Sequence, residues 1–135
     1  MEDWTSTSRI LPVPPGGGVS CAEARDTARA VLTELEMAPE RVEDALTVVS
    51  ELIANARRHA GGVTAFGVTA RAGAVTVEVS DRSPRLPQTR PWAPGEPGGF
   101  GWRLVNQLAD ATDVRFHRSH KTVTATFGYG SPQGR

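Results

Sequence analysis

Apolar residues recur at helical spacing in two segments of the N-terminal half of the chain. Ser20 and Glu23 have the spacing of a capping box, so we expect the first helix to begin there. Pro39 suits the first turn of the second helix, and Gly61-Gly62 ends it. The inward positions are Ala24, Ala28, Val31, Leu32 and Leu35 in the first helix, and Val42, Ala45, Leu46, Val49, Leu52, Ile53, Ala56 and Ala60 in the second.

Alternation of period two predicts the strands that follow the helices. Residues 63–71 and 74–80 flank an Ala72-Gly73 turn, and valines occupy every second position of the later segment. Residues 4–11 alternate more weakly, which is typical of an edge strand. These patterns predict a hairpin with a further strand at its side.

A long irregular segment separates this hairpin from the last elements. Residues 83–98 are rich in proline, arginine and glycine, and a loop of this length in a small domain is usually a lid or binding loop. We place the lid at about 84–98. A helix is predicted from residue 102 to residue 111, and strands at 114–118 and 122–127 form a closing hairpin.

Composition narrows the classes of function. With 135 residues and a mass of 14.4 kDa, residues 1–135 form a single domain with a sizeable core. The formal net charge is 0, so no basic field indicates a nucleic acid as direct partner. The single cysteine, Cys21, excludes an internal disulfide. No apolar stretch approaches the roughly 20 residues of a membrane span, and we expect a cytoplasmic protein that binds no membrane.

Two residues of the second helix carry potential chemistry. Glu51 and Asn55 lie one turn apart on the side opposite the apolar stripe, with Arg58 on the same side and His59 at its margin. A carboxylate can serve as a general base, and an amide oxygen is a ligand suited to Mg²⁺. Taken alone, the same pattern also fits an ordinary solvated helix face.

A glycine-rich run and an aspartate add to this pair. The run Gly98-Gly99-Phe100-Gly101 precedes a predicted helix, whose N-terminal N–H groups suit phosphate. It follows a loop instead of a strand, and it lacks the residues of a Rossmann fingerprint or a P-loop. Asp81 ends a predicted strand and can accept a hydrogen bond from an exocyclic amine such as that of adenine. An aspartate that begins a turn before Ser83-Pro84 is an equally good interpretation.

In this order the motifs resemble those of GHKL-type ATP-binding domains. Glu51-Leu-Ile-Ala-Asn55-Ala resembles their N box, Val79-Ser80-Asp81 the start of the G1 box, and Gly99-Phe-Gly101-Trp-Arg-Leu-Val the G2 box. Lys121-Thr122-Val-Thr-Ala-Thr-Phe resembles the final strand, whose threonine lies near the nucleotide. The resemblance covers about residues 4–128, and the short chain is similar to anti-sigma factor serine kinases of the RsbW and SpoIIAB type.

The resemblance implies an α+β two-layer sandwich, in which a mixed, mostly antiparallel sheet is covered on one face by about three helices. It places ATP between the helices and the lid, with Mg²⁺ held by Asn55 and adenine read by Asp81. The full set of residues that it places at the nucleotide is Asn55, Arg58, His59, Asp81, Ser83, Gly98, Gly99, Phe100, Gly101, Trp102 and Thr122.

The resemblance also implies an activity and partners. Glu51 would activate a serine or threonine of an anti-anti-sigma protein of the STAS type, which competes with a sigma factor for this chain; a homodimer also fits the family. The alternative is a non-catalytic switch in which ATP only orders the lid. Glu96-Pro97 favours the switch, because some relatives carry a basic residue shortly before the glycines. Ser83 and Trp102 also depart from the usual glycine and leucine. A detached histidine-kinase domain is disfavoured, because the chain has no dimerisation helix with a phosphoacceptor histidine.

Overall fold

The structure is a computed structural model that describes residues 7–11, 18–60, 62–84 and 101–128. Most of the predicted lid, 84–98, lies outside these residues, and so do Gly98, Gly99 and Phe100. In chain order the elements are β1 (Thr7–Leu11), α1 (Cys21–Glu34), α2 (Pro39–Ala60), β2 (Val63–Arg71), β3 (Ala74–Asp81), α3 (Gly101–Leu108), β4 (Ala111–Phe116) and β5 (Lys121–Gly128).

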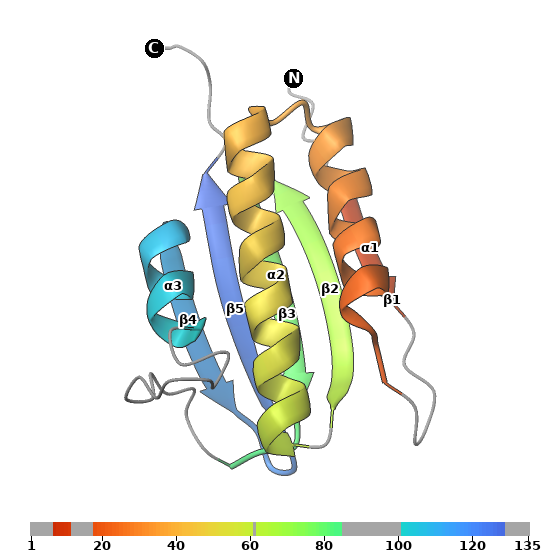
Figure 1. Cartoon of the computed structure of the whole chain (residues 1–135), viewed down its shortest axis with the longest axis vertical. Coiled ribbons are helices and arrows are strands. Elements are labelled where there is room, and N and C mark those ends of the chain that lie inside the picture. The colour runs from red at the N-terminus through yellow and green to blue at the C-terminus, as the bar shows by residue number, and fades with distance from the viewer. Residues whose placement is uncertain (1–6, 12–17, 61, 85–100, 129–135) are drawn as a thin grey trace, which may run out of the picture.

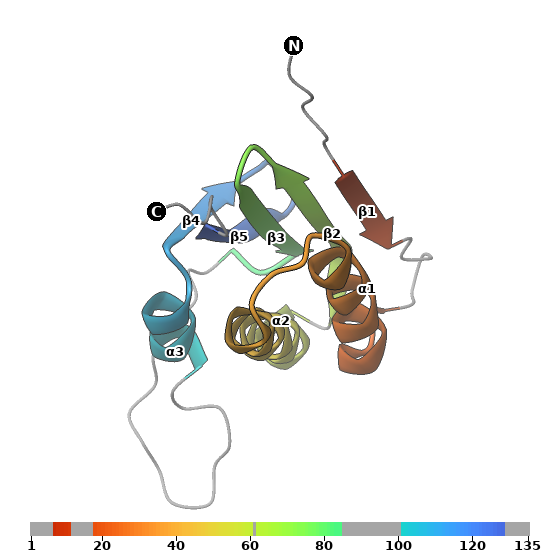
Figure 2. The same ribbon diagram turned by 90° about the horizontal axis from the view of Figure 1, so that it is seen from above.

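The strands form one sheet in the order β1-β2-β3-β5-β4. Figure 2 shows α1, α2 and α3 in a single layer against one face of this sheet, so the predicted α+β sandwich is confirmed. All pairings among the described strands are antiparallel, and the parallel pair that a mixed sheet would contain is not found among them. The last strand, β5, lies between β3 and β4, which places its start beside the end of β3.

The helix α2 supplies the centre of the core. Every stripe residue whose side chain is described is buried, from Val42 to Ala56, as the helical spacing predicted. At the start of α1, the Glu23 N–H donates to Ser20 Oγ and the Ser20 N–H donates to Glu23 Oε1, both at 3.0 Å, so the capping box is confirmed. Among the described residues, no helix is long and apolar enough to span a bilayer.

Several boundaries in the C-terminal half differ from the prediction. The strand β4 covers Ala111–Phe116 instead of residues 114–118. The third helix ends at Leu108 instead of residue 111, because the Asp110 N–H donates to the Thr126 carbonyl at 2.9 Å and the chain has joined the sheet there. The strand β5 begins at Lys121, which the sequence pattern had assigned to the turn. A hydrogen bond of 2.7 Å from the His117 N–H to the His120 carbonyl closes this turn one residue earlier than expected.

Strand alternation gives the sheet two different faces. Val79 and Val123 are cross-strand neighbours that point into the core beneath the helices. The next residues along, Ser80 and Thr122, point to the opposite face, where their hydroxyl oxygens lie 2.8 Å apart. Figures 1 and 2 show no described helix over this second face. The position of a residue along β3 or β5 therefore decides which face its side chain reaches.

Candidate functional site

The carboxylate of Glu51 lies against the first residue of α3. A Cβ atom built on Gly101 would be 2.7 Å from Glu51 Oε1, which is shorter than a carbon–oxygen contact allows. Any larger residue at position 101 would therefore displace this carboxylate from the start of α3. The placement is electrostatically favourable, because the N-terminal end of a helix carries partial positive charge. The fold thus brings together the two motifs that the sequence separates by fifty residues.

Asn55 lies one turn beyond Glu51 on α2. Both side chains are partly exposed, and neither makes a hydrogen bond to another residue in the described part of the chain. Arg58 is exposed on the next turn. His59 belongs to α2, but its side chain lies outside the described residues, so its role stays a prediction. Glu51 and Asn55 are consequently polar groups that remain available to a ligand.

Asp81 ends β3 in a buried ion pair that the sequence pattern did not predict. Its Oδ1 and Oδ2 atoms lie 2.9 Å and 3.2 Å from Nζ of Lys121, and 4% and 3% of the two side chains are exposed. The Ser83 N–H also donates to Asp81 Oδ1, at 2.8 Å. That bond spans two residues, as in the aspartate-initiated turn that was one of the two interpretations. Recognition of adenine by Asp81 stays a prediction.

Lys121, and not the predicted Thr122, lies on the same side of the sheet as Asp81. The register sets Lys121 opposite Asp81 beneath the helices, whereas Thr122 points to the other face. There the Thr122 hydroxyl contacts Ser80, at 2.8 Å, and His117 Nε2, at 3.2 Å. The structure therefore does not bring Thr122 to the side of the sheet that holds Asp81. Two signals in the sequence could have shown this. Lys121 is the only lysine, and it shares the period-two positions of the apolar residues of its strand, Val123, Ala125 and Phe127.

The structure describes Trp102 but only one residue of the predicted glycine run. The Trp102 side chain packs against the hydrophobic core, and its carbonyl accepts a hydrogen bond of 2.9 Å from Asn106 Nδ2. These contacts anchor α3, and a contact of Trp102 with nucleotide stays a prediction. Of the run 98–101, only Gly101 is described.

The predicted residues that are described gather at one end of the molecule. Figure 1 shows the C-terminal half of α2, the end of β3 and the start of β5 together toward the lower end of the view. The start of α3 joins them through the contact between Glu51 and Gly101. A carboxylate, an amide, a buried ion pair and a helix N-terminus thus lie on the helix-covered side of the sheet.

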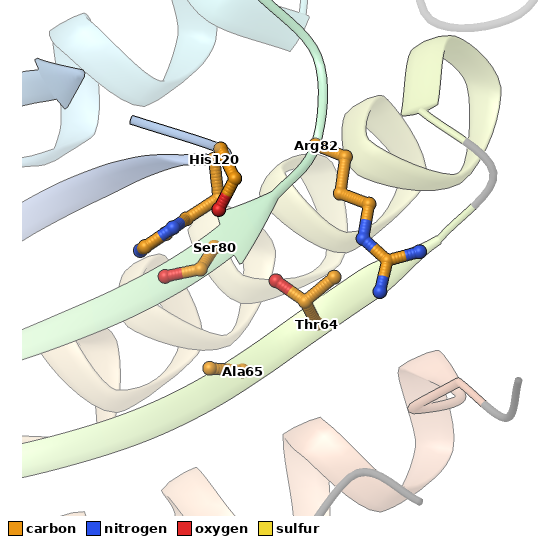
Figure 3. A pocket seen from close by; sticks show the side chains of 6 residues that line it. Thr64, Ala65, Ser80, Arg82 and His120 are labelled. Atoms are coloured by element: carbon orange, nitrogen blue, oxygen red, sulfur yellow. The ribbon is translucent and has the colours of Figure 1, made fainter. Parts of the chain in front are cut away.

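A pocket of about 300 Å³ lies on the opposite side of the same strands. Figure 3 shows Ser80, Arg82 and His120 around it, with Thr64 on the neighbouring strand. The His120 ring stacks on that of His117, with ring centres 4.3 Å apart. Because Ser80 and Asp81 point to opposite faces of β3, this pocket is separate from the group around Glu51.

Comparison with known proteins identifies the fold. A family described as histidine kinase-like ATPase domain matches residues 19–127, from just before α1 to β5. The chain belongs to this family. The search of curated proteins found no match. A chain of the SiaB–SiaC complex from Pseudomonas aeruginosa, solved by crystallography, is 14% identical and superposes with a TM-score of 0.58. The match covers 90% of this chain and 88% of that chain, and at this identity it shows the fold alone.

Membership of the histidine kinase-like ATPase family confirms the GHKL resemblance and implies ATP as the ligand. The described residues also fit the metal ion that accompanies ATP. Among them, no group of three or more His, Cys, Asp or Glu could hold a metal by itself. Mg²⁺ needs no such group when nucleotide is present, because it keeps several waters and shares phosphate oxygens. The uncommitted amide oxygen of Asn55, one turn from Glu51, is a suitable protein ligand.

Proposed function

We propose that this ATPase domain is a serine/threonine protein kinase that acts as a partner-switching regulator. Its substrate would be an anti-anti-sigma protein of the STAS type, and its second partner would be a sigma factor. The observation that carries the proposal is the carboxylate of Glu51, which lies against Gly101 and one turn from Asn55 and makes no hydrogen bond within the described residues. A fold relative, SiaB–SiaC, was solved as a complex of two proteins, which supports a protein partner.

Glu51, Asn55 and the N-terminus of α3 would each have a separate role in phosphoryl transfer. The carboxylate of Glu51 takes the proton from the attacking hydroxyl while that oxygen bonds to the terminal phosphorus and the bond to the ADP oxygen breaks. Asn55 would hold Mg²⁺, which neutralises charge on the phosphates when it is bound. The N-terminal N–H groups of α3 favour the phosphate oxygens. Glu51 and Asn55 both come from α2, a long helix packed on the core, so the two groups are presented rigidly.

The second candidate is a non-catalytic switch in which ATP shapes a protein-binding surface. Glu96-Pro97 favours it, because a basic residue for the terminal phosphate is missing at that point of the sequence. Incubation with labelled ATP, Mg²⁺ and candidate small regulator proteins separates the two functions. Label on a serine or threonine of a partner supports the kinase. An ATP-dependent complex without label supports the switch. If neither label nor a complex is found, the proposed partner-switching function is wrong.

Replacing Asn55 with alanine should weaken ATP binding chiefly when Mg²⁺ is present. The loss of one charge-assisted contact predicts an affinity about tenfold lower with the metal and little changed without it. Calorimetric titrations with Mg²⁺ and with a chelator measure both values. Asn106→Ala is the matched control, because that amide bonds to Trp102 and Thr112 within α3 and β4. Equal weakening of the Asn55 variant in both titrations would show that Asn55 does not hold the metal.

A further inference from the structure

The ion pair between Asp81 and Lys121 has hydrogen-bonding capacity to spare. An ionised carboxylate offers about four acceptor positions and an ammonium three protons. Oδ1 of Asp81 accepts from the Ser83 N–H and from Lys121, and Oδ2 accepts from Lys121 alone. Within the described part of the chain, Oδ2 keeps one acceptor position and Nζ keeps one proton. The pair therefore presents one acceptor and one donor side by side.

Stability does not explain why this pair is charged. The neighbouring cross-strand pair on the same face, Val79 and Val123, is apolar and buried. Replacing a buried ion pair by apolar residues of similar volume is often neutral or stabilising, because burial of two charges carries a large desolvation penalty. An apolar pair at Asp81 and Lys121 would continue the core without that penalty. A ligand that uses both charges accounts for their presence.

The choice of lysine also indicates a specific role. Among the 15 lysine and arginine residues of the chain, Lys121 is the only lysine. An ammonium is a compact charge with rotatable donors, whereas a guanidinium is a planar fork. Among the residues that the structure describes, the buried cation is this lysine, which is the cross-strand partner of Asp81. The side chain of Thr122 cannot substitute for it, because it reaches the other face.

Building on the proposed binding of ATP, we propose that Lys121 is a base-specificity residue of the nucleotide site. Its ammonium donates to ring nitrogen N1 of adenine while Asp81 accepts from the exocyclic amine beside it. A base with a 6-oxo group reverses this order: its oxygen meets the carboxylate, and its N1–H meets the ammonium. Because 3% of Lys121 and 4% of Asp81 are exposed, the proposal requires the base to contact the pair by one edge. Lys121 thus selects adenine over guanine and hypoxanthine.

An ATP analogue that lacks only N1 tests this proposal. Calorimetry compares ATP with 1-deaza-ATP, in which a C–H replaces the ring nitrogen, on the wild-type protein. The loss of one hydrogen bond to a charged donor predicts an affinity for the analogue about tenfold lower or more. In Lys121→Met the two ligands should bind equally within a few-fold. Equal affinities of the wild-type protein for ATP and 1-deaza-ATP would overturn the proposal. That result would leave the proposed binding of ATP intact.

Two further variants complete the experiment. Lys121→Met leaves the Asp81 carboxylate buried without a cation, which can destabilise the protein. The double variant Asp81→Asn/Lys121→Met removes both charges, and it should also bind ATP and 1-deaza-ATP equally. Arg82→Met is the control, because Arg82 lines the pocket on the opposite face. This variant should keep the wild-type ratio of the affinities for ATP and 1-deaza-ATP. A tenfold preference for ATP that persists in either Lys121 variant overturns the proposal. Wild-type protein that binds neither ligand refutes the proposed function instead.

Discussion

Replacing Glu51 with glutamine should abolish most of the phosphoryl transfer and leave ATP binding almost intact. Glutamine keeps the size of the side chain and much of its hydrogen bonding, but it cannot accept the proton of the attacking hydroxyl. General-base catalysis is typically worth about 10²–10⁴ in rate, so transfer to the partner should fall by that factor. The affinity for ATP should stay within a few-fold, because the carboxylate acts on the hydroxyl of the partner.

Labelled ATP and calorimetry measure the two effects on the same preparation. Glu78→Gln is the matched control, because Glu78 is exposed on the face of β3 opposite the helices. If the Glu51 variant phosphorylates its partner at the wild-type rate, Glu51 is not the base. If neither protein transfers label while both form an ATP-dependent complex, the domain is a switch and not a kinase.

The second large effect is expected at Gly101. An alanine Cβ would lie 2.7 Å from Glu51 Oε1, so the carboxylate must move. Because that oxygen is the tip of a flexible side chain, the fold tolerates the movement, and the free energy of unfolding should change by less than about 1 kcal/mol. A displacement near 1 Å at a reacting group can reduce the rate about 10²-fold, and we expect a loss of that order in phosphoryl transfer.

The double variant shows whether the alanine acts through the carboxylate. Glu51→Gln combined with Gly101→Ala should be no slower than Glu51→Gln alone, since both changes remove the same contribution. Gly18→Ala is the control, because a Cβ there would meet no atom within 4 Å. Losses that multiply in the double variant would show that Gly101 acts independently of Glu51.

Local sequence pattern predicted the start of α1 and the buried face of α2 well. The apolar stripe of α2 and the capping box at Ser20 depend on residues within a few turns of one another, so spacing alone defines them. The same spacing placed Glu51 and Asn55 together on the side of α2 away from that stripe. What spacing could not give is the contact between Glu51 and Gly101, which depends on how α3 packs against α2.

The pair of Asp81 and Lys121 was missed for a related reason. The pattern began the last strand at Thr122, one residue late, and so assigned Lys121 to the turn. Which face each residue reaches depends on the register between β3 and β5, and a shift of one residue exchanges the two faces. Register is set by pairing across forty residues of sequence, which no local pattern reports.

Calorimetric titration of the folded protein with ATP and Mg²⁺ tests the central claim most directly. The arrangement of Glu51, Asn55, Asp81 and Gly101 predicts a saturable heat of binding that weakens when Mg²⁺ is removed. Circular dichroism on the same sample confirms that the domain is folded. No binding at roughly 1 mM nucleotide, the upper end of ordinary substrate affinities, would contradict the assignment of this group of residues to ATP.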